Sequence, residues 1–471
     1  MLRPHHDRAL PTVTATPGQT FAIDRAGCRS VHRTADDFEA IRRVLQTRYD
    51  FREPILSAGS DAAVGMQAWL QKALTAPLTR SSPELRRFLE PDSADSEDDI
   101  DADLDDALGN LSVDEDLDKE IKQSLSVPTV PASLDDFQLL KVIGKGAFGK
   151  VMLVRSKSDP KQLFALKQLD KSKVRNKDQS EHAMTERNIL EYIRHPFIVT
   201  MRGAFQTESK LFIVLDYCAG GELFFHLQRM GTFSEELARF YTAQLVLAIE
   251  YLHELGIVFR DLKLENVLLD AKGNIQLTDF GLSKEGVADN VSARSFCGTP
   301  EYLAPEVLTG TGYGRAADWW SLGTLLFEML TGLPPFYAKD SKQLFQRILT
   351  SRLRLPYHVS PEAGDLLQRL LSRNVESRIG SSDDDAREIK QHCFFAGIDW
   401  DLLLAKEVPP PFNPCDGLAP DDTSNFDIDF TNLPVASTDL ASGSFVKDVD
   451  PDLSNSLSDF PFPLNPASGQ R

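Results

Sequence analysis

Short apolar runs bounded by turn residues begin the middle part of the chain. Residues 150–154 and 164–169 have this pattern, which is typical of β-strands. Farther on, apolar residues recur at three- and four-residue spacing until Gly256, a residue type that often follows the end of a helix. The apolar positions of this helix are Leu237, Tyr241, Leu245, Ala248 and Leu252. Strands followed by helices predict an α+β protein with two lobes and a cleft between them.

Three further segments flank this region. Residues 21–90 show helical spacing and predict a small, mostly helical module. Its apolar positions are Phe38, Ile41, Leu45, Met66, Trp69, Leu70 and Leu74. Residues 91–134 combine many acids with no aromatic residue, which predicts a disordered acidic linker. Residues 396–471 are rich in Pro, Asp and Ser with isolated Phe residues, and predict an extended tail.

The net charge is distributed unevenly along the 471 residues. Of a formal charge of −19, residues 92–120 carry −13 and residues 413–471 carry −8, so the rest of the chain is close to neutral. We therefore expect no nucleic-acid partner. No apolar run approaches the ~18 residues of a membrane span, and the first twenty residues lack the apolar core of a secretory signal. We expect a cytoplasmic protein that reaches endosomal or plasma membranes only peripherally.

Five cysteines, odd in number, lie far apart and form no CxxC pair. This spacing favours reduced thiols over a disulfide framework or a structural zinc site.

A glycine-rich loop lies between two of the predicted strands. Glycines let backbone N–H groups approach a phosphate because no Cβ intervenes. In a dinucleotide-binding fold such a loop would open a helix, whereas here a second strand follows. That strand carries Lys167, which is costly to bury unless an anion meets it; the alternative is an edge-strand lysine that reaches solvent. The loop consists of Gly144, Lys145, Gly146, Ala147, Phe148 and Gly149.

A polar cluster follows the long helix. Asp261, Lys263, Asn266 and Asp279 supply two acids, an amide and a cation within twenty residues. Carboxylate and amide oxygens suit Mg²⁺, and a positioned carboxylate suits an acceptor hydroxyl. Each piece alone also fits a turn or a surface charge. The fixed order of glycine loop, strand lysine, this cluster and the later Ala-Pro-Glu at 304–306 argues against coincidence.

These motifs resemble a eukaryotic protein kinase domain over residues 137–395, and Glu186 stands where a kinase pairs a glutamate with the strand lysine. The details are similar to the AGC group, close to the protein kinase B and serum/glucocorticoid-regulated kinase branches. They are carried by LDY at 215–217, GGEL at 220–223, FCGTPEY at 296–302 and DWWSLG at 318–323. The resemblance implies a bilobal fold, with a β-rich N-terminal lobe, an α-rich C-terminal lobe and an AGC-type C-terminal extension.

The resemblance also implies the cofactors of a non-specific serine/threonine protein kinase. The glycine loop would cover the phosphates of ATP, and Lys167, held by Glu186, would pair with the α- and β-phosphates. Asp279 and Asn266 would hold Mg²⁺, or Mn²⁺ in its place. The residues implied around the adenine and the hinge are Val151, Ala165, Leu215, Asp216, Cys218, Glu222 and Leu268.

At the reacting end, the resemblance implies that Lys263 neutralises the transferring phosphoryl group and that Asp261 accepts the proton of the Ser or Thr hydroxyl. Three carboxylates, Glu222, Glu265 and Glu328, fall where related kinases bind basic substrate residues, which implies a preference for Arg before the acceptor. Glu328 lies in an apolar helical stretch, so a purely structural role is the alternative for it.

Ser295 matches the activation-loop phosphosite of the family, and an upstream kinase would be the partner that phosphorylates it. The cations in the phosphate-receiving positions are His182, Arg260 and Lys284. Glu306 and Arg378 would form a buried structural pair. Phe259 replaces the usual His or Tyr at an apolar packing position. A kinase-like scaffold without turnover is an alternative, and the complete catalytic set argues against it.

The tail resembles an AGC extension, with residues 425–427 near the active-site tether and Ser437 as the turn-motif phosphosite. Pro461 stands where the hydrophobic motif F-x-x-F-[S/T]-[F/Y] usually carries its phosphoacceptor. The tail therefore cannot be switched there by phosphorylation. It either docks through its aromatic residues or does not dock at all.

The N-terminal module is similar at residues 65–70 and 82–89 to the C-terminal helices of a PX domain, a phosphoinositide reader, and more loosely at residues 32–38. Too few residues precede residues 32–38 for a complete three-stranded sheet, so we expect a shortened, partial PX-like module. A weak phosphoinositide contact would make the chain a membrane-recruited adaptor. The alternative is a helical regulatory cap without a lipid site.

Overall fold

The computed structural model describes the backbone of three strands within residues 12–34, and then residues 133–146, 148–174, 177–284, 293, 297–435, 457 and 460–462. The chain divides into two compact units, residues 1–128 and residues 129–471, and each is described by itself. In these described parts, no helix is long and apolar enough to cross a bilayer.

The N-terminal unit contains an antiparallel sheet of three strands, β1 (Thr12–Thr16), β2 (Thr20–Asp24) and β3 (Val31–Thr34), in that order. The prediction that too few residues were available for such a sheet was wrong. Strands of four or five residues fit within residues 12–34, and the Thr- and Val-rich sequence of β1 favours a strand. The sheet begins upstream of residue 21, where the mostly helical module was predicted to start. Its predicted helices and residues 91–132 of the predicted linker lie outside the described residues.

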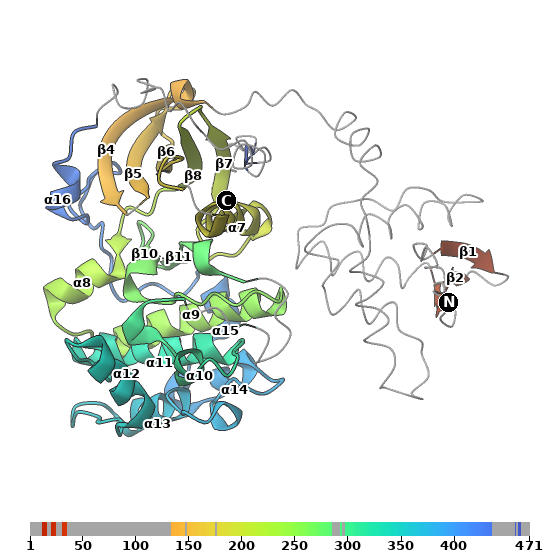
Figure 1. The fold of residues 1–471 in the computed structure, drawn as a ribbon, viewed down its shortest axis with the longest axis vertical. Coiled ribbons are helices and arrows are strands. Elements are labelled where there is room, and N and C mark those ends of the chain that lie inside the picture. The colour runs from red at the N-terminus through yellow and green to blue at the C-terminus, as the bar shows by residue number, and fades with distance from the viewer. Residues whose placement is uncertain are drawn as a thin grey trace. The chain divides into compact units, whose positions relative to one another are not determined.

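An antiparallel five-stranded sheet in the order β4-β5-β6-β8-β7 forms the N-terminal lobe of the second unit (Figure 1). Successive side chains along each strand point to opposite faces of the sheet. One face carries the rings of Phe205 and Phe212, stacked at 4.8 Å, and the other joins α7 in the main core. The elements are β4 (Phe137–Lys145), β5 (Gly149–Ser156), β6 (Leu163–Asp170), α7 (Lys177–Tyr192), β7 (Met201–Gln206) and β8 (Lys210–Asp216).

Helices make up most of the second lobe (Figure 1). The predicted long helix is α9 (Glu235–Glu254): the Ser234 hydroxyl accepts from the Leu237 N–H at its start, and Gly256 follows it in the left-handed region at φ 68°. The other elements are β9 (Gly221–Glu222), α8 (Leu223–Met230), β10 (Val267–Leu269), β11 (Ile275–Leu277), α10 (Pro305–Thr309), α11 (Ala316–Thr331), α12 (Ser341–Thr350), α13 (Pro361–Leu370), α14 (Ala386–Lys390) and α15 (Trp400–Leu404).

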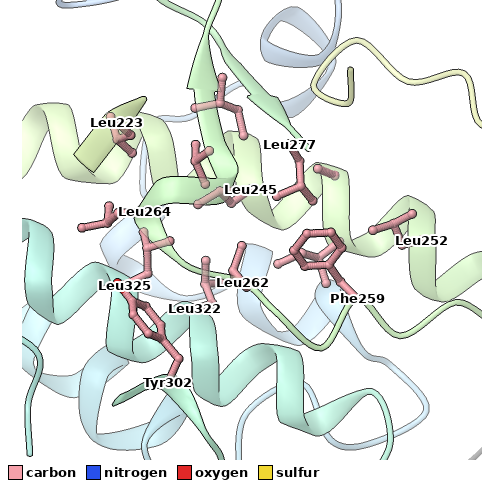
Figure 2. Close-up of a cluster of buried hydrophobic side chains, with 14 of the residues drawn as sticks. Leu223, Leu245, Leu252, Phe259, Leu262, Leu264, Leu277, Tyr302, Leu322 and Leu325 are labelled. Carbon is pink, nitrogen blue, oxygen red and sulfur yellow. The ribbon is translucent and has the colours of Figure 1, made fainter. Parts of the chain in front are cut away.

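Buried apolar side chains surround the segment that carries the predicted catalytic residues. Figure 2 shows Leu245 of α9, Leu262 of that segment and Leu322 of α11 among them. Phe259 is fully buried and its ring meets Phe280 edge-on at 5.1 Å, which confirms the predicted apolar packing position. Because such cores are close-packed, they hold the neighbouring polar residues in fixed positions.

The first part of the tail packs along the surface of the N-terminal lobe. Arg155 of β5 pairs with Asp421 at 2.6 Å. The ring of Tyr217 stacks on Phe426 at 5.9 Å, and its hydroxyl donates to the Asp422 carbonyl at 3.0 Å. The short helix α16 (Ile428–Thr431) then packs beside β4, as Figure 1 shows.

Candidate active site

The glycine-rich loop is a hairpin between β4 and β5. Lys145 pairs with Lys150, and the Gly146 N–H donates to the Gly149 carbonyl at 3.0 Å. Gly149 is a steric requirement, because a Cβ there would lie 1.7 Å from the Gln168 carbonyl oxygen. Ala147 lies outside the described residues. A loop with so little side-chain bulk can bring backbone N–H groups close to phosphate oxygens.

Lys167 on β6 meets two carboxylates that the sequence places far from it. Its Nζ lies 2.6 Å from Glu186 Oε1 on α7 and 3.2 Å from Asp279 Oδ1. Burial alone would lower the pKa of Lys167, but the charges of Asp279 and Glu186 outweigh burial and raise the pKa. The charge of Lys167 lowers the pKa of Asp279 in turn. Lys167 and Asp279 therefore both stay charged at neutral pH.

Asp261 is the centre of a second hydrogen-bonded group. Its Oδ2 accepts from Lys263 Nζ at 2.7 Å and from Asn266 Nδ2 at 3.0 Å, and its Oδ1 accepts from Thr299 Oγ1 at 2.9 Å. Lys263 also donates to Thr299 Oγ1 at 3.0 Å. These contacts fix the direction of the carboxylate. Thr299 was not predicted as a site residue, although its place in the FCGTPEY motif was a signal that could have identified it.

Asn266 and Asp279 have the oxygen donors that a hard divalent cation prefers. Asn266 uses its side-chain nitrogen for Asp261, so its side-chain oxygen is the atom that suits a metal. The Asp279 side chain is about half exposed (49%) and uses Oδ1 for Lys167. One carboxylate and one amide fit Mg²⁺, which is usually held by one or two protein ligands together with phosphate oxygens and water.

The residues expected around the adenine and the hinge come from both lobes. Ala165 of β6 is the cross-strand partner of Leu215 of β8. The Asp216 carboxylate accepts from both Arg202 Nε (2.6 Å) and Arg202 Nη2 (2.9 Å), which holds the start of the hinge. The apolar members of this group share one hydrophobic cluster and are Val151, Ala165, Leu215, Cys218 and Leu268.

The three predicted substrate carboxylates act on one another electrostatically. Burial and the nearby charges of Glu265 and Asp427 raise the pKa of Glu222 to about 7. Burial and the charge of Glu265 also raise the pKa of Glu328 to about 7, although the Tyr302 hydroxyl donates to Glu328. Mutually repelling carboxylates bind an added cation well. Tyr302 is a second contributor to the site that was not predicted from the sequence.

The phosphosites predicted at Ser295 and Ser437 lie outside the described residues. Of the receiving cations, His182 lies on α7. A backbone bridge between Val258 and Lys284 brings Lys284 beside the segment that carries Arg260. Arg260 Nε donates to the Leu282 carbonyl at 2.5 Å, which places its guanidinium against the start of the activation segment.

The predicted structural pair of Glu306 and Arg378 is present. Arg378 Nη1 donates to Glu306 Oε1 at 2.6 Å, Nη2 donates to Oε2 at 2.9 Å, and both side chains are buried. Two parallel bonds of this kind hold α10 firmly to the segment after α13.

The end of the tail docks on the N-terminal lobe, which decides between the two alternatives drawn from the sequence. Phe460 is fully buried, and the Phe462 N–H and carbonyl exchange hydrogen bonds of 2.8 Å and 3.0 Å with Ala204 of β7. Arg187 of α7 donates to the Phe460 carbonyl at 3.2 Å and lies over the Phe462 ring. Pro461 is exposed between the two rings. Backbone carbonyls and aromatic rings make this contact.

The fold and the site define a protein kinase: a glycine-loop hairpin, a strand lysine paired with a helix glutamate, and an oriented aspartate beside a lysine and an asparagine. The chain belongs to the protein kinase family. The protein kinase domain of that family matches residues 137–395, which are the limits predicted from the sequence.

Similar curated proteins support the AGC group of serine/threonine kinases. The chain is 49% identical over 314 residues to ribosomal protein S6 kinase beta of Caenorhabditis elegans (66% of this chain, 57% of the relative). It is 50% identical over 308 residues to serine/threonine-protein kinase Sgk1 of Fundulus heteroclitus (65% and 71%). It is 46% identical over 320 residues to RAC-beta serine/threonine-protein kinase of Homo sapiens (68% and 66%). The match thus spans between 57% and 71% of the length of these relatives.

Proposed function

We propose that the protein is an active kinase that transfers the γ-phosphoryl group of Mg-ATP to Ser or Thr of protein substrates in intracellular signalling. The observation that carries this proposal is that the Lys167 ammonium donates hydrogen bonds to the carboxylates of both Glu186 and Asp279. A kinase-like scaffold would not need this complete and mutually hydrogen-bonded set. The set therefore favours turnover over a binding role.

Phosphoryl transfer depends mainly on positioning and charge neutralisation, and each polar group here suits one task. Lys167, directed by Glu186, would bind the phosphates that do not react. Lys263 would bind the phosphoryl group that moves, and Asp261 would orient the acceptor hydroxyl and take its proton as the new O–P bond forms and ADP leaves. Mg²⁺ held by Asp279 and Asn266 supplies neutralisation of the phosphate charge.

The test is transfer of γ-phosphate to Arg-containing Ser/Thr peptides. We expect Asp279→Ala to lower kcat/KM on the order of 10³-fold or more, since it removes a metal ligand and a partner of Lys167. The matched control is Asp401→Ala, an exposed carboxylate on α15 that should leave activity unchanged. If Ser295-phosphorylated wild type is no faster than Asp279→Ala across a broad peptide set, the scaffold becomes the better interpretation.

The acidic cluster of Glu222, Glu265 and Glu328 supports a preference for Arg two to five residues before the acceptor. Arg pairs with carboxylates through two parallel hydrogen bonds, which gives such a site geometric selectivity. In a positional-scanning peptide array, Arg at these positions should raise the rate, and Glu222→Gln should reduce that benefit. An array with no benefit from Arg would exclude this substrate class.

Activation would need an upstream kinase at Ser295 and no phosphate in the hydrophobic motif. The docked Phe460 and Phe462 with exposed Pro461 support this one-step scheme. We expect Ser295→Ala to be much weaker than wild type, with phosphate at Ser295 checked by mass spectrometry. Full activity of unphosphorylated protein would contradict it.

The three-stranded sheet within residues 12–34 supports the proposal that the N-terminal unit holds a partial PX-like module. This supports a weak phosphoinositide contact as a second role, by which the full chain would reach endosomal or plasma membranes. Flotation of the full chain with phosphoinositide-containing vesicles, compared with vesicles of phosphatidylserine at equal charge, tests this role. Equal binding to both would favour a regulatory cap without a lipid site.

A further inference from the structure

A buried imidazole lies between two carboxylates next to the catalytic loop. His253, in the last turn of α9, has its Nε2 3.0 Å from Asp318 Oδ2 and its Nδ1 2.9 Å from Asp385 Oδ2. The side chains of His253 and Asp318 are 0% and 1% exposed. Because both ring nitrogens face carboxylate oxygens, both carry a proton and the ring is a cation. None of these three side chains has a role in the proposed phosphoryl transfer.

The backbone at Asp385 is strained. Its φ of 41° and ψ of −124° are dihedrals that residues with a side chain rarely adopt. Its Oδ1 also accepts from Trp319 Nε1 at 2.6 Å, and its N–H donates to the Ser382 carbonyl at 3.0 Å. A strained backbone persists only where the surrounding contacts over-determine it. The contacts of Asp385 with His253, Trp319 and Ser382 therefore hold its carboxylate in place despite the strained backbone.

Asp318 links this cluster to the catalytic residues. Its Oδ2 accepts from the Phe259 N–H and its Oδ1 from the Arg260 N–H, each at 2.8 Å. Arg260 has the left-handed φ of 69°, and the next residue is Asp261. One buried carboxylate thus fixes the two peptide groups that precede the catalytic aspartate. The same carboxylate contacts His253 through Oδ2.

Other charged groups on the elements packed against α9 have partners of their own. Lys390 of α14 pairs with Glu250, and Lys406, which follows α15, pairs with Asp270. His392, which precedes the turn at Cys393–Phe395, pairs with Asp365. Burial would lower the pKa of His253, but Asp385 and Asp318 raise it to about 9. Among the described residues, these two carboxylates are the charges that hold the ring protonated.

We propose that Asp385 is a positioning residue for the catalytic loop: it keeps His253 doubly protonated, and His253 then holds Asp318 against the two N–H groups that precede Asp261. This inference rests on the proposed kinase activity. It gives a role in turnover to a residue that touches neither nucleotide nor substrate in the scheme above.

The test uses the full chain phosphorylated at Ser295. Asp385→Asn keeps the side-chain shape and tolerates a positive φ, so it removes mainly the charge. We expect kcat to fall about tenfold or more, because a small displacement of a catalytic group has effects of this size. The KM values for ATP and peptide should not change. Between pH 6.5 and 8.5 the kcat of the variant should decrease as His253 loses its proton, whereas that of wild type should not follow this titration.

Asp384→Asn is the matched control, because Asp384 is adjacent, 67% exposed and paired only with Arg387 among the contacts described, and it should behave as wild type. Asp385→Gly relieves the strain and removes the carboxylate, and it replaces Asp385→Asn if that variant does not fold. An Asp385 variant with the wild-type kcat and pH profile would overturn the proposal. So would a lower melting temperature with unchanged kcat, which marks a purely structural role.

The imidazole chemical shifts of His253 in isotope-labelled wild type decide its charge without any variant. A doubly protonated ring at pH 7.5 is expected, and a neutral ring would overturn the proposal. If wild type transfers no phosphate, the proposed function fails, while this spectrum still reports whether Asp385 and Asp318 hold the charge.

Discussion

Removal of the Phe460 ring tests whether the tail positions α7. The ring is fully buried in the main core, and Arg187 of α7 donates to the Phe460 carbonyl at 3.2 Å. Truncation of a buried Phe to Ala costs about 3–5 kcal/mol. A loss at the lower end, about 3 kcal/mol, changes the ratio of docked to undocked tail roughly 100-fold.

Undocking would act on catalysis through α7, because Arg187 directly follows Glu186, the partner of Lys167. We expect Phe460→Ala to lower kcat with phosphate present at Ser295 and to speed amide hydrogen exchange in α7. Pro461→Ala, at an exposed position, is the control that should change neither. A Phe460→Ala enzyme with unchanged kcat and unchanged exchange in α7 would show that the tail docks without supporting the helix.

Four further predictions concern stability, nucleotide binding and pH. Arg378→Ala leaves Glu306 buried without its partner and should lower the free energy of unfolding in urea by about 3–5 kcal/mol, whereas Arg387→Ala, which breaks an exposed pair, should change it by less than about 1 kcal/mol. Gly149→Ala places a Cβ 1.7 Å from the Gln168 carbonyl oxygen and should raise the KM for ATP, which a titration of the rate with ATP measures. The KM for Arg-containing peptides should fall between pH 6 and 8 as Glu222 and Glu328, each with a pKa of about 7, ionise; peptides without Arg should show no such trend. The raised pKa of His253, about 9 against an ordinary 6.5, contributes stability that is fully present below pH 6.5 and lost as the pH rises through 9, so urea unfolding of Asp385→Asn should lose this pH dependence.

The kinase residues could be predicted because phosphoryl transfer restricts both their types and their order along the chain. Lys167 contacts Glu186 and Asp279, and Asn266 contacts Asp261. The long helix α9 was predictable because its buried face repeats along the sequence. The N-terminal sheet was missed because strands of four or five residues leave too short a pattern to recognise.

Other site residues could not be predicted because their partners lie far away in the chain. Thr299 matters through Asp261 and Lys263, and Tyr302 matters through Glu328. Nothing in the sequence beside Arg187 indicates that a tail more than 270 residues later would supply the carbonyl groups for its guanidinium.

The order of residue types along the chain was enough to identify its chemical groups: a complete set of kinase residues, and a proline at 461 where no phosphate can be added. The tertiary structure alone decided that the tail docks, and that His253 meets Asp318 and Asp385, which lie 65 and 132 positions away in the chain. The reason is physical. Residue types and local periodicity are properties of short segments, whereas burial and the distance between charges are set by the packing of the whole domain.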